Sequence, residues 1–214
     1  REKVTYIPNF VNKEKWHPLP KEEVLRLRED LGLDQHQFIV VGAGQVQKRK
    51  GIDDFIRLAE ELPQITFIWA GGFSFGGMTD GYEKYKKMME NPPKNLLFPG
   101  IVTPERMREL YSLADIFLLP SYNELFPMTI LEAASCDAPI MLRDLDLYKV
   151  ILEGNYHATA DKDEMKQSIL EYQKNPDSLK ELKEKSKTIS REYSEEHLLQ
   201  IWLEFYQEQA ALGR

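Results

Sequence analysis

Cysteine and histidine are scarce in this sequence. Cys136 is the only cysteine, so no disulfide can form within the chain, and we expect a reducing, cytoplasmic location with Cys136 as a small core residue. The four histidines, at positions 17, 36, 157 and 197, show neither the spacing of a metal site nor that of a catalytic triad. No HEXXH, CxxC or DxD-type signature is present. We therefore expect no metal ligands and no metal cofactor.

Long hydrophobic runs and surplus positive charge are also missing. No apolar run approaches the roughly 18 residues of a membrane span, and no signal peptide is visible. The formal net charge of -7 argues against nucleic-acid binding by bulk charge, which needs an excess of Lys and Arg. Any phosphate binding must then depend on a local basic cluster. The chain begins at Arg1 and continues directly into a strand-like segment at 4–8, so we expect a piece of a longer protein.

What the sequence has in abundance is an alternation of apolar strands and amphipathic helices. Hydrophobic residues make up 42% of 214, enough for a sizeable core. The strand-like segments after the first lie at 37–44, 65–72, 95–100, 115–120, 138–144 and 155–160. Helical patterns occupy 21–33, 51–62, 82–91, 104–114, 128–136, a turn within 145–154, and 161–175, 177–192 and 194–212. Such alternation predicts the α/β class: a doubly wound parallel sheet of about six strands with C-terminal helices.

In sheets of this kind, ligands bind outside the carboxyl ends of the strands. The first loop to inspect there is GAGQVQKRKG, residues 42–51. Gly42 and Gly44 form G-x-G, but Gln47 replaces the third glycine of a dinucleotide fingerprint, and no acidic residue follows the second strand. A nicotinamide oxidoreductase is therefore disfavoured. Three cations, Lys48, Arg49 and Lys50, instead stand where we expect a helix N-terminus, a setting that suits a diphosphate.

Two further loops face the same edge. AGGFSFGG, residues 70–77, has glycines that permit close approach of the backbone to a ligand. PSYNELFPMTILEAAS, residues 120–135, places Pro127 at the expected first position of a helix, which leaves the N–H groups of Met128 and Thr129 free for an anion.

Two carboxylates flank this expected anion site. Glu124 precedes the helix and Glu132 lies inside it, about 7 to 8 Å apart along the axis. Ionised carboxylates accept hydrogen bonds from hydroxyls, so a ligand built as sugar, phosphate, sugar would fit: a nucleotide sugar. Glu132 has apolar neighbours on its helix, where a lone carboxylate is costly to bury.

The sequence carries a resemblance on these residues. Glu-x7-Glu in NELFPMTILE, followed by EAASCDAPIM, is similar to the signature of retaining glycosyltransferases of family 4, which have the GT-B fold. TYIPNFVNKEKWHP resembles the entry to the second domain of that family, GQVQKRKG its phosphate-binding loop, and FPGIVTPERMRELYSLADIFLLPS the run toward the sugar site. SREYSEEHLLQIWLEFY resembles its closing helices. The similarity covers nearly the whole chain.

The resemblance implies that residues 1–214 are the C-terminal nucleotide-sugar-binding domain, Rossmann-like, of a GT-B glycosyltransferase whose N-terminal acceptor domain is absent. Glu124 would be the catalytic residue at the donor sugar, and Glu132 would hold the ribose. The other substrate-binding residues would be Gly44, Gln45, Lys48, Arg49, Lys50, Gly71, Ile101, Val102, Thr103, Phe126, Met128 and Thr129.

This sequence departs from the family pattern at three places. Gln45 replaces the usual phosphate-binding arginine, and Lys48 or Arg49 is expected to compensate. Leu125 and Pro127 stand where the family has glycines. The glycine pair expected after the strand at 138–144 is replaced by RDLDLY, residues 143–148.

The implied activity is retaining transfer of a hexose from a nucleotide sugar, UDP-glucose or UDP-galactose, with no metal and no other cofactor. In the family the donor's own phosphate serves as leaving group and base, so no protein nucleophile is needed. The isolated piece should bind donor without turnover. RDLDLYK suggests a bacterial glycolipid acceptor, and hence a place at the inner face of the membrane through the missing domain. The apolar last helix would cross back to that domain.

Two alternatives stay open at this stage. A GT-B sugar-nucleotide epimerase should carry more acid and base residues in its cleft. A non-catalytic nucleotide-binding or interaction module would bind no donor productively, or no nucleotide at all. Titration with UDP, GDP and ADP separates the last of these from the others.

Overall fold

The computed structural model describes residues 5–73 and 76–212, which form a parallel six-stranded sheet between two layers of helices. Each neighbouring pair of strands runs parallel, in the order β3-β2-β1-β4-β5-β6. The strands are β1 Ile39–Ala43, β2 Thr66–Ala70, β3 Leu96–Gly100, β4 Ile116–Leu119, β5 Ile140–Arg143 and β6 His157–Thr159. The predicted doubly wound sheet of about six strands is confirmed.

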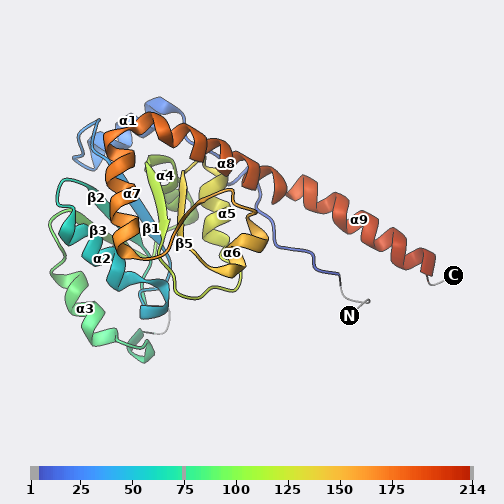
Figure 1. Ribbon diagram of the computed structural model, residues 1–214, viewed down its shortest axis with the longest axis horizontal. Coiled ribbons are helices and arrows are strands. Elements are labelled where there is room, and N and C mark those ends of the chain that lie inside the picture. Colours follow the sequence, from blue (N-terminus) through green and yellow to red (C-terminus); the bar gives the residue numbers. More distant parts are fainter. Residues whose placement is uncertain (1–4, 74–75, 213–214) are drawn as a thin grey trace.

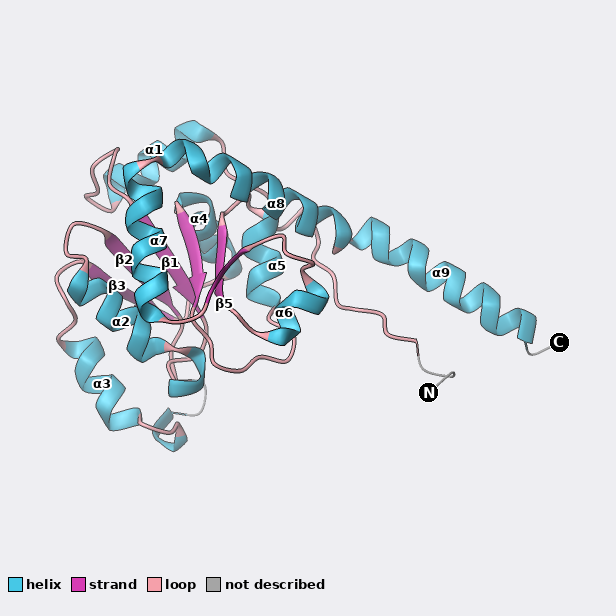
Figure 2. Ribbon diagram, viewed as in Figure 1, coloured by secondary structure: helices cyan, strands magenta, loops and turns pink. Residues whose placement is uncertain are grey.

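Helices cover both faces of the sheet (Figures 1 and 2). They are α1 Lys21–Asp30, α2 Ile52–Glu61, α3 Tyr82–Glu90, α4 Pro104–Leu113, α5 Met128–Ser135, α6 Asp146–Ile151, α7 Lys162–Lys174, α8 Leu179–Glu192 and α9 Glu195–Leu212. Side chains that alternate along the strands pack into two apolar clusters on opposite faces of the sheet. One cluster includes residues of α1, α4, α5 and α6, and the other includes residues of α2, α3 and α7. Burial from both sides explains why the central strands read as continuous apolar runs.

The order of the strands fixes where a ligand can bind. The chain winds outward from β1 through β2 to β3, then returns to pair β4 with the other side of β1. The loops that leave β1 and β4 therefore diverge at one point, and the crevice between them is the usual ligand site of this topology.

At the amino ends of the same two strands, Arg28 and Asp115 form a partly buried ion pair. Arg28 donates from Nη1 to the Gln37 carbonyl at 2.6 Å and from Nη2 to Asp115 Oδ2 at 3.3 Å. Asp115 also accepts the Ile39 N–H at 2.8 Å. These polar contacts hold this end of the sheet together, and Arg28 and Asp115 also line a hollow of about 400 Å³ there.

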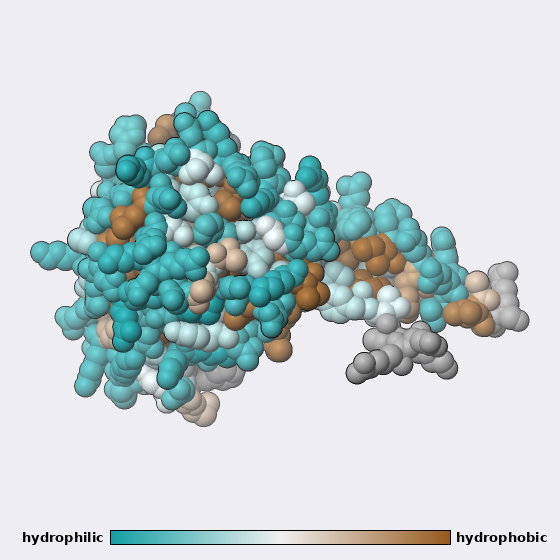
Figure 3. Space-filling model, in the orientation of Figure 1, coloured by the Kyte–Doolittle hydropathy of each residue, from teal (hydrophilic) through white to brown (hydrophobic). Residues whose placement is uncertain are grey.

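The last helix is unlike the others because it leaves the body of the protein (Figure 1). Leu198 at its base is buried, but beyond it large apolar side chains lie open to solvent. Figure 3 shows brown, hydrophobic surface along this projecting helix. The exposed ones are Leu199, Trp202, Leu203, Tyr206 and Leu212.

The predicted first strand is wrong. Residues 5–10 are extended without a ladder partner, and Val4 lies outside the described residues. Only Val11 forms a bridge, with Ser194, at the start of α9. An extended segment needs a neighbouring edge to become a strand, and this one runs along the outside of the molecule. Among the described residues, no helix combines the length and the apolarity that crossing a bilayer requires.

Candidate functional site

A pocket of about 450 Å³ opens where the loops after β1 and β4 meet. Its walls are formed by Arg49, Lys50, Asn123, Glu124, Leu125, Phe126, Pro127, Met128 and Thr129. Six of these were predicted from the sequence as ligand contacts, while Asn123, Leu125 and Pro127 were not. The pocket thus joins a basic turn, a carboxylate and a helix N-terminus at the topological switch point.

Lys50 and Glu124 form an ion pair at the centre of this pocket. Lys50 Nζ lies 2.6 Å from Glu124 Oε1, and Arg49 Nη1 lies 3.6 Å from Glu124 Oε2. The Glu124 side chain is only 4% exposed, and that of Lys50 14%. A carboxylate buried to this degree needs a cation and hydrogen bonds to stay ionised. The two cations meet that need.

A second set of contacts ties the two loops together. The Arg49 carbonyl accepts the Tyr122 N–H at 2.9 Å, and Arg49 Nη1 donates to the Asn123 carbonyl at 2.7 Å. Gly51, with φ +73°, passes so close to this loop that a Cβ there would lie 2.2 Å from the Pro120 carbonyl oxygen. Only glycine combines that conformation with that approach.

The predicted position of the basic cluster needs correction. Lys48–Lys50 form a short 3₁₀ turn of their own, and α2 begins only at Ile52, after Gly51 in the left-handed conformation. The break follows from the close passage of Gly51 against Pro120. Lys50 is thereby directed toward Glu124, whereas the exposed Lys48 does not line the pocket.

The start of α5 also differs by one residue from the prediction. Pro127 is the N-cap rather than the first helical residue, with φ -77° and ψ 102°. The first backbone bond there runs from the Ile130 N–H to the Pro127 carbonyl. The Met128 and Thr129 N–H groups therefore have no partner within the helix and stand at the pocket wall. A helix N-terminus of this kind favours anions.

Glu132 lies apart from this pocket, on the side of α5 that faces α4. The Tyr111 hydroxyl donates to Glu132 Oε2 at 3.1 Å. Burial raises the pKa of the Glu132 carboxyl, and the Tyr111 hydrogen bond offsets this only in part. The carboxyl is half-buried and accepts one hydrogen bond from a side chain, so it has capacity left for donors from a ligand.

The loops after β2 and β3 continue the same edge of the sheet. A Cβ on Gly71 would lie 1.9 Å from the Gly44 carbonyl oxygen, and one on Gly44 would lie 3.6 Å from Lys50 Cδ. Gly72 is next to Ile101, whose Cγ1 would be 3.2 Å from an added Cβ. Gly44, Gly71 and Ile101 thus form a chain of neighbours leading away from Lys50.

The remaining predicted contacts have structural partners of their own. Gln45 Oε1 accepts a hydrogen bond from Gln47 at 2.7 Å. Thr103 caps α4 by accepting the Arg106 N–H, and Val102 packs against the core. The Phe126 ring packs in a tilted arrangement against the Tyr193 ring, with the two centroids 5.8 Å apart. These contacts do not test a ligand role for any of them.

Residues with acid or base chemistry are few at this edge. Within the described ranges, no histidine lines the pocket, and no group of three His, Cys, Asp or Glu side chains is arranged to hold a metal ion. His157 lies instead against Ser168 and Tyr172, and burial lowers its pKa. Burial raises the pKa of the Cys136 thiol to about 12, which leaves it unreactive.

Sequence reasoning missed a cluster behind the pocket, formed by the buried Asp54 and Arg143 and the exposed Tyr122. Its only signal in the sequence was an arginine at the end of an apolar strand, where a glycine pair was expected. Arg143 is 8% exposed and Asp54 7%.

Residues 24–189 match the family described as glycosyl transferases group 1. The chain belongs to this family. It is 86% identical over 214 residues to alpha-galactosylglucosyldiacylglycerol synthase from Streptococcus pneumoniae, and it spans 57% of the length of that protein. The predicted resemblance to a glycosyltransferase family is thereby confirmed.

Solved structures agree on the fold. Anabaena HepE, crystallised in complex with UDP-glucose, superposes with a TM-score of 0.81 at 18% identity over 98% of this chain and 58% of its own. The C-terminal domain of a group 1 glycosyl transferase, LpcC from Francisella tularensis, gives 0.69 at 15% identity over 86% of this chain and 99% of its own. At these identities the likeness establishes the GT-B type of fold and nothing finer.

Proposed function

We propose that this chain is the donor-binding half of a retaining glycosyltransferase, and that its pocket takes a UDP-hexose. The observation that carries the proposal is the convergence of Lys50, Glu124 and the N-terminus of α5 in one pocket. A cation and free N–H groups suit a diphosphate, and a carboxylate beside them suits the hydroxyls of a hexose. Family membership provides the reaction class.

In this proposal the ligand lies along the edge of the sheet. The diphosphate takes the Met128 and Thr129 N–H groups and the Lys50 ammonium, with Lys48, Arg49 and Gln45 at its margin. Glu132 accepts the ribose hydroxyls in the place where its pKa is raised by burial. The base lies toward Gly71 and Ile101–Thr103, and the hexose lies at Glu124, beside Gly44 and Phe126.

The chemistry follows from where charge develops. As the bond between the anomeric carbon and the phosphate oxygen breaks, negative charge grows on the diphosphate and positive charge grows on the sugar ring. Lys50 and the N-terminus of α5 stabilise the first, and the Glu124 carboxylate stabilises the second. The departing phosphate is the base that takes the proton of the acceptor, so the reaction uses no protein nucleophile.

The acceptor is proposed from the relatives. The 86% identical protein is named for the synthesis of a galactosylglucosyldiacylglycerol, so we infer a glycosyldiacylglycerol acceptor and, within the UDP-hexoses, a galactosyl donor. A lipid acceptor implies work at the inner, cytoplasmic face of the membrane, through an acceptor domain that precedes residue 1 in the intact protein. We propose that α9, with its exposed apolar face, packs against that domain.

The direct test is calorimetric titration of this chain with UDP, GDP, ADP and uridine. We expect UDP to bind, with lower affinity for the other two diphosphates. Lys50→Ala should weaken UDP binding by about 1.5 to 3 kcal/mol, the value of a charge-assisted hydrogen bond, and leave uridine unchanged. The exposed Lys87, on α3, provides the matched control: Lys87→Ala should change neither. A folded chain that binds no nucleotide would refute the proposal and favour an interaction module.

A further inference from the structure

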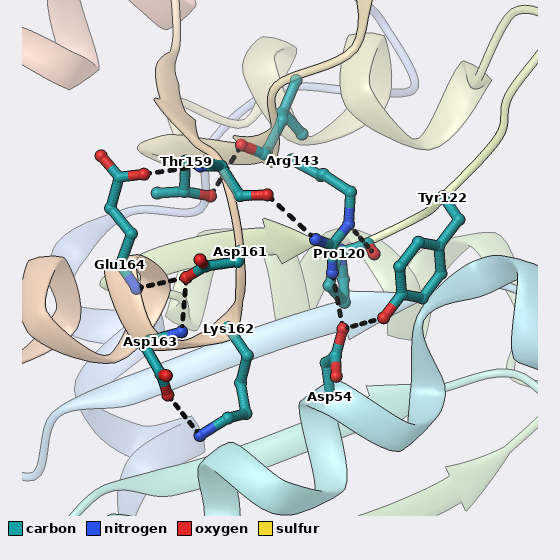
Figure 4. A network of polar contacts seen from close by, with 11 residues as sticks. Asp54, Pro120, Tyr122, Arg143, Thr159, Asp161, Lys162, Asp163 and Glu164 are labelled. Carbon is teal, nitrogen blue, oxygen red and sulfur yellow. Dashed lines mark hydrogen bonds and ion pairs between the residues drawn. The ribbon is translucent and has the colours of Figure 1, made fainter.

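The cluster of Asp54, Tyr122 and Arg143 is centred on the buried guanidinium of Arg143, at the end of β5 (Figure 4). Nη2 donates to Asp54 Oδ2 at 2.5 Å, Nε to the Pro120 carbonyl at 3.1 Å and Nη1 to the Ala160 carbonyl at 3.2 Å. The guanidinium carbon lies 4.1 Å from the centre of the Tyr122 ring. The Tyr122 hydroxyl donates to the same Asp54 oxygen at 2.6 Å.

This one side chain therefore connects the end of β5 to three other segments of the chain. Asp54 is in the first turn of α2, four residues after Lys50. Pro120 and Tyr122 belong to the loop that ends in Glu124, and Ala160 follows β6. The two segments that carry Lys50 and Glu124 are thus fastened to the same guanidinium.

The anchor at Ala160 is itself fixed. The Ala160 N–H donates to Glu164 at 2.6 Å, and Asp161 caps α7 by accepting the Asp163 and Glu164 N–H groups. Figure 4 shows these contacts at the start of α7 beside Arg143. Arg143 consequently links the start of α7 to the loop after β4.

We infer that Arg143 is a positioning residue for the donor site: it sets the distance between Lys50 and Glu124 without touching the ligand. This inference rests on the proposed function for its ligand, and on the contacts above for its geometry. Arg143 does not bind phosphate itself, because its donors are directed to Asp54 and two carbonyls and it is buried. A lysine could preserve the charge opposite Asp54, but it lacks the planar fork that reaches both carbonyls and stacks on the Tyr122 ring.

The test is the variant Arg143→Lys, measured with UDP and with uridine. The displaced β4 loop should leave Lys50 and Glu124 out of register, so UDP binding should weaken by about 10-fold while uridine binding changes by less than about 2-fold. The matched control is Arg28→Lys at the opposite end of the sheet. Arg28 is also buried and also holds one aspartate and two carbonyls.

Arg28→Lys should lower the melting temperature to a similar degree and leave the ratio of UDP to uridine affinity at its wild-type value. If Arg143→Lys and Arg28→Lys have the same effect on that ratio, Arg143 is an ordinary stabilising residue and the inference is overturned.

A second measurement needs no ligand. The coupling between Lys50 and Glu124, obtained from unfolding of the two single variants and the double variant, should fall to less than half in the Arg143→Lys background. Unchanged coupling contradicts the inference even if UDP binds. If the wild-type chain binds no nucleotide, the proposed function fails while the coupling still decides whether Arg143 positions the pair.

Discussion

At the scale of single residues, the central feature is the ion pair between Lys50 and Glu124 in the pocket. Each was predicted from the sequence to contact the donor, at its diphosphate and at its hexose respectively. If a diphosphate binds as proposed, it competes with the Glu124 carboxylate for the Lys50 ammonium. The pairing also offsets the cost of burying the Glu124 side chain.

The stability of this pair can be measured without ligand. Lys50→Met leaves the buried Glu124 with only the more distant Arg49, so it should lower the free energy of unfolding by about 2 kcal/mol or more. The double variant Lys50→Met/Glu124→Gln, which removes both charges, should recover most of that loss. Urea denaturation gives both values. Effects that add within about 0.5 kcal/mol would show that the two side chains do not interact.

Glu132 makes a prediction about pH. Burial raises the pKa of Glu132 in the folded chain above its ordinary value of 4.5. The free energy of unfolding therefore falls as the pH rises from the unfolded pKa through the folded pKa, because ionising the buried carboxyl is costly. Glu132→Gln removes the cost, and its amide oxygen can still accept from Tyr111. The variant should therefore be more stable than the wild type at about pH 7.5, by a margin that shrinks toward about pH 3.5. Urea titrations at the two pH values measure the margin, and an equal margin at both would contradict the assignment.

At the scale of elements, the site is made by glycines that let two loops touch. Gly71→Ala would place a Cβ 1.9 Å from the Gly44 carbonyl oxygen, at a backbone φ of +144°. We expect a loss of more than about 2 kcal/mol in stability. Gly77→Ala is the control, since nothing lies within 4 Å of its added Cβ, and it should stay within about 0.5 kcal/mol of the wild type. Thermal unfolding compares the three proteins; equal melting temperatures would show that the loops are loosely packed.

The elements themselves were predictable from the sequence, and the contacts between them were not. The strands read as apolar runs because helices cover both faces of the sheet. Their approximate number and their parallel direction therefore followed from the sequence pattern. The Lys50–Glu124 pair joins positions 74 residues apart, and no local signal specifies such a pairing. Arg143 was read as a departure from a family pattern because an arginine after a strand looks like a surface turn until its partners are seen. The first strand failed because its pattern was right but no sheet edge lies beside it.

At the scale of the whole molecule, the α/β body buries most of its large apolar side chains, whereas α9 leaves several of its own exposed. Leu198 is 1% exposed, whereas Leu199 is 54% and Leu203 45% exposed on the same helix. A hollow of about 530 Å³ lies at the base of this helix, between it and residues 12–14. Its lining includes none of the predicted ligand residues. If the proposed acceptor domain precedes this chain, we expect it to cover this surface.

This surface can be tested by comparing two lengths of protein. Leu199→Ser and Leu203→Ser should reduce binding of a hydrophobic dye by this chain without lowering its melting temperature, because both side chains are largely exposed. Leu198→Ala should cost about 2 to 5 kcal/mol, as expected for a buried leucine.

In the intact protein, hydrogen exchange at 199–206 should slow relative to this chain. Equal exchange in the two proteins would show that α9 does not pack against the preceding domain.

The central claim is that a UDP-hexose lies along this edge of the sheet, with its hexose in the pocket at Glu124 and its ribose outside the pocket at Glu132. UDP titrations of two variants test it most directly. Glu132→Ala should weaken UDP binding by about 10- to 150-fold, because it removes a charged acceptor of hydroxyl hydrogen bonds. Glu124→Ala should leave UDP affinity unchanged or raise it, because it frees Lys50 for the diphosphate, and should lower turnover in the intact enzyme. The opposite pattern, UDP binding lost with Glu124→Ala and kept with Glu132→Ala, would contradict the account.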